Sequence, residues 1–130
     1  MCPFTVKSPV PIFEKLLKLI PNLEQLDSAL KMTAQGYMDL GVDLLERNHY
    51  KRVVALSHYY LHPSGDMIPD PDMTIAVYFG TRTAEALTYQ DCFGFRRVYT
   101  EDMAAFNPMA KKELNHFLNQ WLSNLLQQGH

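Results

Sequence analysis

Residues 72–87 read DMTIAVYFGTRTAEAL, two runs of β-prone residues that meet at Gly80-Thr81. A glycine-containing pair between two such runs is typical of a tight hairpin turn. Since the turn sets the register, four facing pairs are predicted. These pairs are Phe79 with Arg82, Val77 with Ala84, Ile75 with Ala86, and Met73 with Thr88. The other face of this hairpin then carries Tyr78 and a lone acid, Glu85.

Other segments around the hairpin also predict strands. Residues 38–44 alternate apolar with polar or small side chains, which indicates a half-buried strand. Residues 50–61 are rich in β-branched and aromatic types, and residues 93–99 follow a turn. The segment 62–71 contains three prolines and a glycine and is predicted to be a loop. The sequence therefore predicts an antiparallel meander of about five strands.

Helices are predicted before and after these strands. Residues 1–11 contain three prolines and are predicted to be a loose arm, followed by a helix with one apolar stripe. Residues 22–25 resemble a capping box, an asparagine followed three residues later by glutamine, and would begin a second short helix. In the last segment, Asn107 is the expected N-cap, Pro108 takes the first helical position, and Gly129 ends the helix.

Helices before and after a run of strands are typical of the α+β class. We predict that residues 1–130 form one α+β domain, in which the long C-terminal helix packs on the apolar face of the sheet. A chain of this length can bury a core without metals or disulfides. A single pair of helices leaves part of a five-stranded sheet uncovered, so self-association is expected there, and we predict a homodimer.

The composition argues against several classes of protein. Hydrophobic residues make up 47% of the chain, too many for a disordered protein, and the net charge of -2 gives no field for nucleic acid or an anionic membrane. Seven tyrosines could stack on single-stranded nucleic acid, but that role also requires clustered positive charge. The sequence contains no apolar run of about 18 residues and no secretory signal. With Cys2 and Cys92 as free thiols, we predict a cytoplasmic protein without a nucleic-acid or membrane partner.

No group of residues predicts a metal, a cofactor or a nucleophile. His58 and His62 are four residues apart, but on a strand their Cα atoms are separated by roughly 13 Å, too far for one ion. Ser57 precedes His58, and adjacent strand residues point to opposite faces, so the two cannot act together. No glycine-rich run begins a helix, which argues against a phosphate loop. We therefore predict no cofactor and no metal.

Glu85 is the strongest candidate for a functional residue. A carboxylate inside a strand needs a partner when it is buried, and Arg96 and Arg97 lie on the next predicted strand. One interpretation is a structural pair between Glu85 and one of these arginines. The other is a binding group or an acid in a pocket under the last helix. That pocket would also use Arg96 or Arg97, His58 and Tyr78.

The hairpin with Glu85 and the segment NHFLNQWLSNLLQQG (residues 115–129) resemble the YqiB family of proteobacteria. The likeness covers most of the chain from about residue 13. It includes Met73, Thr74, Tyr78, Ala84, Phe95, Tyr99, residues 22–26 and Tyr50. That family is a domain of unknown function, so the resemblance implies a bacterial, cytoplasmic protein but no activity. This chain lacks the acids that the family commonly has at positions 80–81 and at the start of the last helix.

Two functions remain as expectations. The first is a non-catalytic cytoplasmic module that binds another protein, or a second copy of itself, through its sheet. The alternative is a small-molecule-binding protein or a hydrolytic enzyme with a pocket between the sheet and the C-terminal helix around Glu85. A deep cavity beside Glu85 favours the alternative, whereas an exposed apolar contact surface favours the first.

Overall fold

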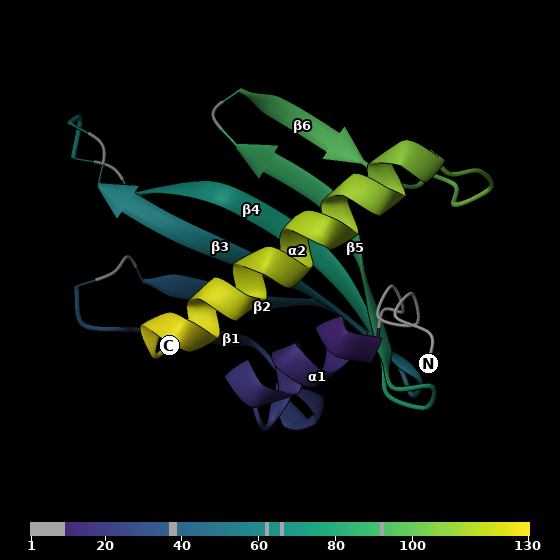
Figure 1. Cartoon of the computed structure of the whole chain (residues 1–130), viewed down its shortest axis with the longest axis horizontal. Coiled ribbons are helices and arrows are strands. Elements are labelled where there is room, and N and C mark those ends of the chain that lie inside the picture. The colour runs from purple at the N-terminus through teal and green to yellow at the C-terminus, as the bar shows by residue number, and fades with distance from the viewer. Residues whose placement is uncertain (1–9, 37–38, 62, 66, 92) are drawn as a thin grey trace, which may run out of the picture.

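The computed structural model describes residues 10–36, 39–61, 63–65, 67–91 and 93–130 (Figure 1). The loose arm predicted for residues 1–11 therefore lies almost entirely outside the described residues. The described chain contains two α-helices, one short 3₁₀-helix and six strands. Their bounds are α1 (Val10–Leu19), η2 (Leu23–Gln25), β1 (Ala29–Met32), β2 (Leu40–Arg47), β3 (Lys51–Leu61), β4 (Met67–Tyr78), β5 (Thr83–Asp91), β6 (Gly94–Arg97) and α2 (Pro108–Gln128).

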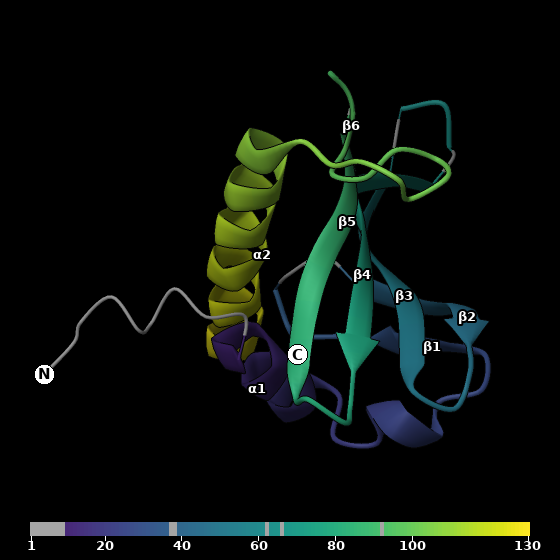
Figure 2. The ribbon, with the colours of Figure 1, turned by 90° about the vertical axis from the view of Figure 1, so that its right-hand side faces the viewer.

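The strands form one antiparallel sheet in which each strand pairs with the next along the chain. Both α-helices lie on the same face of this sheet (Figures 1 and 2). Lys15 of α1 joins them, because its Nζ donates to Asn119 Oδ1 and to Ser123 Oγ of α2, each at 2.7 Å. The predicted α+β meander with a long C-terminal helix on the sheet is therefore confirmed. Among the described residues no helix covers the opposite face, which we call the outer face.

The sheet has one strand more than the sequence predicted. β1 pairs with β2, so that Ala29 faces Asp43 at one end and Met32 faces Leu40 at the other. The second helix that the sequence predicted is only the three-residue η2, and Asn22 makes no capping hydrogen bond with its side chain. A four-residue, partly exposed strand has little local signal of its own, so its pairing with β2 decides its structure.

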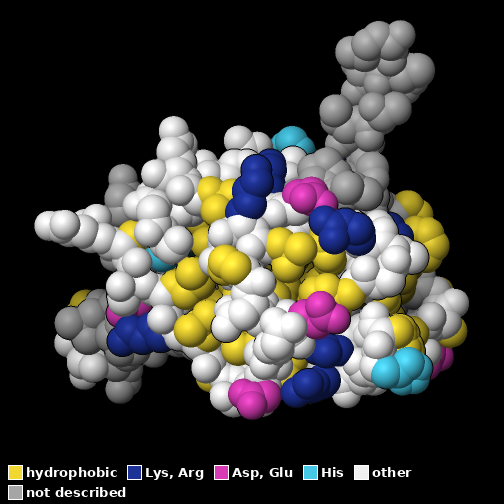
Figure 3. Space-filling view, turned by 90° about the horizontal axis from the view of Figure 1, so that it is seen from below, with side chains coloured by type: hydrophobic (Ala, Val, Ile, Leu, Met, Phe, Trp, Pro, Cys, Tyr) yellow, Lys and Arg dark blue, Asp and Glu magenta, His cyan; other side chains and the backbone are white. Residues whose placement is uncertain are grey.

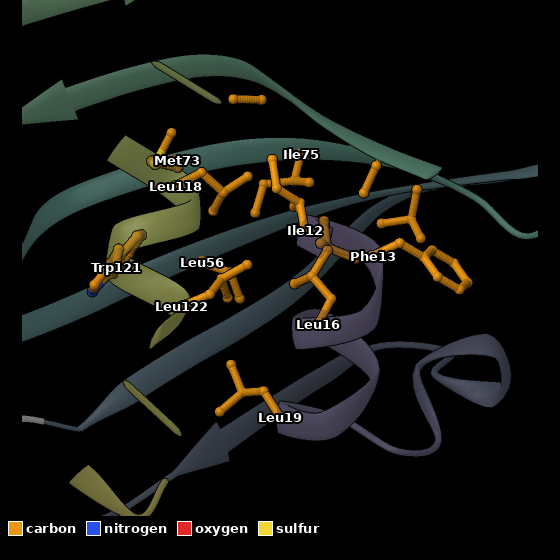
Figure 4. Packing of buried hydrophobic residues seen from close by; sticks show 14 of the residues in the cluster. Ile12, Phe13, Leu16, Leu19, Leu56, Met73, Ile75, Leu118, Trp121 and Leu122 are labelled. Atoms are coloured by element: carbon orange, nitrogen blue, oxygen red, sulfur yellow. The ribbon is translucent and has the colours of Figure 1, made fainter. Parts of the chain in front are cut away.

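The apolar core lies between the helices and the inner face of the sheet (Figure 4). Phe13 and Leu16 of α1, and Leu118 and Leu122 of α2, are buried against residues of β3 and β4 such as Ile75. At its N-terminus α2 is capped as predicted, because the Asn107 side chain accepts hydrogen bonds from the backbone of Met109 and Ala110. At its other end Gly129 has a φ of 95°, the left-handed conformation that favours glycine. The helix is thus positioned by both its ends and its apolar stripe.

The hairpin register is confirmed near the turn and wrong further away. Val77 faces Ala84 and Ile75 faces Ala86, as predicted. A β-bulge then inserts Leu87 into β5, so that Met73 faces Tyr89 rather than Thr88. The bulge returns Tyr89 to the inner face, where its ring packs edge-on against Phe117 of α2.

Residues 62–71 are not the long loop that their prolines predicted, because β4 begins at Met67. Pro69 faces Tyr59 of β3. On its other side β4 is not yet paired with β5, because the pairing of these two strands starts at Asp72. Pro71 falls at the register shift between β3 and β4. Proline is tolerated in a strand at bulges and where no ladder hydrogen bond is needed. Both positions meet this condition.

The edge of β5 is closed by a side chain of α2. The Ala86 backbone N–H, in a fully buried residue, donates to Asn115 Oδ1 at 2.9 Å. The Asn115 side chain also donates through Nδ2 to the Lys111 carbonyl at 2.7 Å, which fixes its orientation. A buried backbone donor without an acceptor is costly, so Asn115 protects this edge from both solvent and pairing.

Replacing Asn115 by leucine should lower the free energy of unfolding by about 1–3 kcal/mol, because Ala86 loses its acceptor inside the protein. Urea denaturation measures the effect. Asn124→Leu is the matched control, since Asn124 is an exposed residue of the same helix. Equal losses in the two variants would contradict the role of Asn115.

Candidate functional site

Glu85 lies on the outer face of β5 with only 19% of its side chain exposed. The Tyr99 hydroxyl donates to Glu85 Oε1 at 2.5 Å, and the Tyr78 hydroxyl donates to Oε2 at 3.5 Å. The Lys111 ammonium forms an ion pair with Oε1 at 3.6 Å. We call Tyr78, Glu85, Tyr99 and Lys111 the Glu85 cluster. It joins β4, β5, the connection after β6 and the first turn of α2.

The connection 98–107 brings Tyr99 and Lys111 to Glu85. It begins with a hydrogen bond from the Val98 N–H to the Leu87 carbonyl, and it closes with one from the Asn107 N–H to the Val98 carbonyl. In between, Tyr99 and Phe106 form an isolated antiparallel bridge. The connection thus folds back on itself and starts α2 where Lys111 can reach the Glu85 carboxylate.

Lys111 is held by aromatic rings as well as by charge. Its Nζ donates to the Tyr99 hydroxyl at 3.2 Å and lies 5.6 Å from the centre of the Tyr99 ring and 5.3 Å from that of Phe106. A cation over aromatic faces is attracted by their quadrupoles. This contact explains why a lysine is accepted in the first turn of α2, where the helix dipole disfavours positive charge.

Tyr78, Tyr99 and Lys111 keep their protons near neutral pH. Burial, followed by the Glu85 charge, raises the pKa of Tyr78 to about 12. Burial and the hydrogen bond to Glu85 also raise the pKa of Tyr99. The hydrogen bond with Tyr99 raises the pKa of Lys111. Since general acid–base catalysis works best with a pKa near the operating pH, these three groups are suited to donating hydrogen bonds rather than to exchanging protons.

The two arginines predicted as partners of Glu85 do not contact it. Arg96 pairs with Glu113 of α2 at 2.7 Å, and Arg97 pairs with Glu101 at 3.7 Å. The prediction was wrong because β6 runs only beside residues 88–91 of β5 and ends before it reaches Glu85. Lys111 takes the expected place of the arginine, and no local sequence signal indicated it.

His58 lies in a different part of the molecule from Glu85. It is buried on the inner face, with its ring 5.4 Å from Trp121 and 5.8 Å from His130. Trp121 is ten residues along α2 from Lys111, a rise of roughly 15 Å. The candidate site predicted from Glu85, Tyr78, His58 and the arginines is therefore split, and only Tyr78 accompanies Glu85.

Two hollows of about 300 and 320 Å³ lie beside the cluster, and both are open to solvent. Arg97, Tyr99 and Thr100 line both of them, so they adjoin on the outer face. Glu85 lines neither. Within the described ranges, no three histidine, cysteine or acidic side chains lie close enough to hold a metal ion.

Large exposed apolar side chains are concentrated in one stretch of the chain, a feature that the sequence analysis missed, and two of them, Met103 and Phe106, line these hollows. Seven are exposed in the described chain, and five of them fall between residues 93 and 109. The five are Phe93, Phe95, Met103, Phe106 and Met109. Figure 3 shows the molecule from below the view of Figure 1, and on this face apolar side chains lie between charged groups of both signs.

A family model described as a domain of unknown function (DUF6908) matches residues 11–130. The chain therefore belongs to this family, whose description names no activity. No curated protein and no solved structure matches the chain. These findings do not link the chain to the YqiB family or to proteobacteria, so that resemblance remains a prediction. In the part of the chain that is described, neither helix has the length and apolar character needed to cross a membrane.

Glu85→Gln should lower the free energy of unfolding by about 1–3 kcal/mol without any ligand, because the partly buried tyrosine hydroxyls and Lys111 lose a charged partner. Chemical denaturation tests this. Glu113→Gln is the control, since its ion pair with Arg96 is half exposed and should contribute under about 1 kcal/mol. Unchanged stability of Glu85→Gln would show that the acid is not structural.

Stability should fall as the pH drops below about 6.5, the unfolded pKa of histidine. Burial, helped by His130, lowers the pKa of His58 in the folded protein, so between the two pKa values the unfolded chain binds more protons. The His58 contribution is therefore complete above the unfolded pKa and is lost on acidification toward the folded pKa. Denaturation of wild type and His58→Gln at several pH values measures it. An identical pH dependence in both proteins would contradict this assignment.

Proposed function

We propose that this protein is a non-catalytic module that binds another protein or a second copy of itself. The observation that carries the proposal is the concentration of exposed apolar side chains in the stretch from the β5–β6 turn to the first turn of α2. We call Phe93, Phe95, Met103, Phe106 and Met109, together with Arg97, the 93–109 surface. Exposed apolar side chains that occur singly need no explanation, but a group of them marks a contact site.

Three members of the 93–109 surface, Phe95, Met103 and Phe106, lie close to Arg97. The Arg97 guanidinium lies 5.3 Å from the centre of the Phe95 ring. Arg97 and Met103 line one hollow, and Arg97 and Phe106 line the other. Phe93, Met103 and Met109 are 94%, 54% and 67% exposed. Aromatic residues, methionine and arginine are the types enriched at protein interfaces, which supports a protein as the partner.

The chemistry at Glu85 supports binding more than catalysis. Its carboxylate already accepts two phenolic hydrogen bonds and pairs with Lys111. The hollows nearby are open, and small-molecule sites usually enclose most of their ligand. The alternative function, a small-molecule-binding or hydrolytic pocket around Glu85, therefore has less support from the geometry.

We also propose that the protein is bacterial, lies in the cytoplasm and forms a homodimer. The bacterial source and the cytoplasm follow from the resemblance to the YqiB family and from the composition. The net charge of -2 argues against nucleic acid or an anionic membrane as the partner.

Native mass spectrometry tests the proposal on protein isolated gently from its own cytosol and on concentrated pure protein. We expect a complex of fixed stoichiometry that the variant Phe93→Ser/Met103→Ser/Met109→Ser loses. Leu45→Ser/Tyr50→Ser is the control, because both residues are 56% exposed but lie outside this surface. A complex that survives in the first variant, or the absence of any complex, would contradict the proposal.

A further inference from the structure

We propose that β6 pairs edge to edge with β6 of a second copy, in an antiparallel register centred on Phe95. The two six-stranded sheets then form one continuous sheet. This inference rests on the proposed function and specifies the partner, the contact strand and the register.

The free side of β6 is available for such pairing. β6 is the last strand of the sheet, and its four residues are all exposed. The edge of β5 is closed by Asn115, whereas no helix among the described residues lies along the free edge of β6 (Figure 1). An uncovered edge strand presents unpaired N–H and C=O groups, which bind another strand readily.

The backbone groups of Phe95 and Arg97 point to this free side. The Val98 N–H donates to the Leu87 carbonyl, and Val98 continues the β5–β6 register in which Arg97 faces Thr88. Successive residues of a strand direct their backbone groups to opposite sides. Gly94 and Arg96 therefore bond toward β5, and Phe95 and Arg97 bond away from it.

Symmetry leaves two registers for the pairing. A two-fold axis normal to the sheet keeps each face continuous, so every residue must face a partner on the same face. Registers centred on Phe95 or on Arg96 pair three residues of β6 with three of its copy, more than any other such register of this four-residue strand. Centring on Arg96 would place two guanidinium groups directly opposite each other, which is less favourable than an aromatic pair even with Glu113 beside each of them. Centring on Phe95 instead pairs the two outward-pointing backbones of Phe95 with each other.

The Phe95 register is also self-complementary in its side chains. Phe95 and Arg97 face Gln90 and Thr88, and so lie on the outer face. The two Phe95 rings meet at the axis, and Arg97 of each copy faces Phe93 of the other. Aromatic pairs and arginine–aromatic pairs across strands are both favourable. Phe93, a turn residue directly before β6 that is 94% exposed in a single copy, is thereby covered.

The charges of the edge do not oppose association. Arg96 points to the inner face, where Glu113 neutralises it at 2.7 Å. Arg97 is paired with Glu101 at 3.7 Å. Each copy thus brings compensated charges to the contact. This balance favours a second copy over a strongly acidic peptide, which would have to displace both glutamates.

Disulfide trapping tests the register in the full chain with Cys2 and Cys92 replaced by serine. In the Phe95-centred register the two Cα atoms of residue 95 are about 5.5 Å apart, within the range of a disulfide. Those of residue 96 are then about 8 Å apart, beyond it. We expect oxidation to link the Phe95→Cys variant into a dimer and to leave Arg96→Cys monomeric. Linking of Arg96→Cys alone, or of neither variant, would overturn the inference.

Sedimentation velocity gives a second test without cysteines. Wild type should sediment as a dimer, and Phe95→Lys as a monomer with an unchanged circular dichroism spectrum, because two ammonium groups would meet at the axis. Leu45→Lys is the control and should remain dimeric. A dimer that persists in Phe95→Lys would overturn the inference. A monomeric wild type that binds a different protein through the 93–109 surface would overturn it too, while leaving the proposed function intact.

Discussion

The half-buried carboxylate of Glu85 is the constraint on which one end of this molecule depends. It accepts hydrogen bonds from Tyr78 of β4 and Tyr99 of the connection 98–107, and it pairs with Lys111 of α2. A shielded carboxylate requires such partners, so the chain after β6 must fold back across the sheet before α2 begins. The same contacts hold that connection in place. Its methionine and phenylalanine side chains are consequently presented to solvent on a structured support rather than on a loose loop.

Two strand edges lie near this cluster, one on β5 and one on β6, and only that of β5 is closed by a side chain. Asn115 closes the edge of β5 by accepting the N–H of Ala86. In the described part of the chain β6 has no such cover, and its exposed Phe95 belongs to the 93–109 surface. A structured edge of this kind is suited to binding a strand. A catalytic role for Glu85 would instead need a carboxylate free to meet a substrate, and its oxygens are already engaged.

Local signals in the sequence predicted the parts of the fold that depend on neighbouring residues. Asn107, Pro108 and Gly129 fixed the ends of α2, and the turn fixed the pairing of Val77 with Ala84. Features that depend on distant contacts were missed. β1 forms because it pairs with β2. The bulge at Leu87 changes the β4–β5 register on the side of Ile75 away from the turn. Glu85 was identified as an acid in need of a partner, but the partner is Lys111, because the path of residues 98–107 decides which cation arrives.

The central claim is that the end of the sheet held by the Glu85 cluster is the contact surface of this protein. Residue-resolved amide hydrogen exchange, measured by nuclear magnetic resonance over a range of protein concentrations, tests it most directly. The account predicts that the Phe95 and Arg97 amides gain protection as the concentration rises, while the Arg96 amide, already bonded to β5, changes little. Concentration-dependent protection confined to another part of the chain, such as β1 or α1, would contradict it.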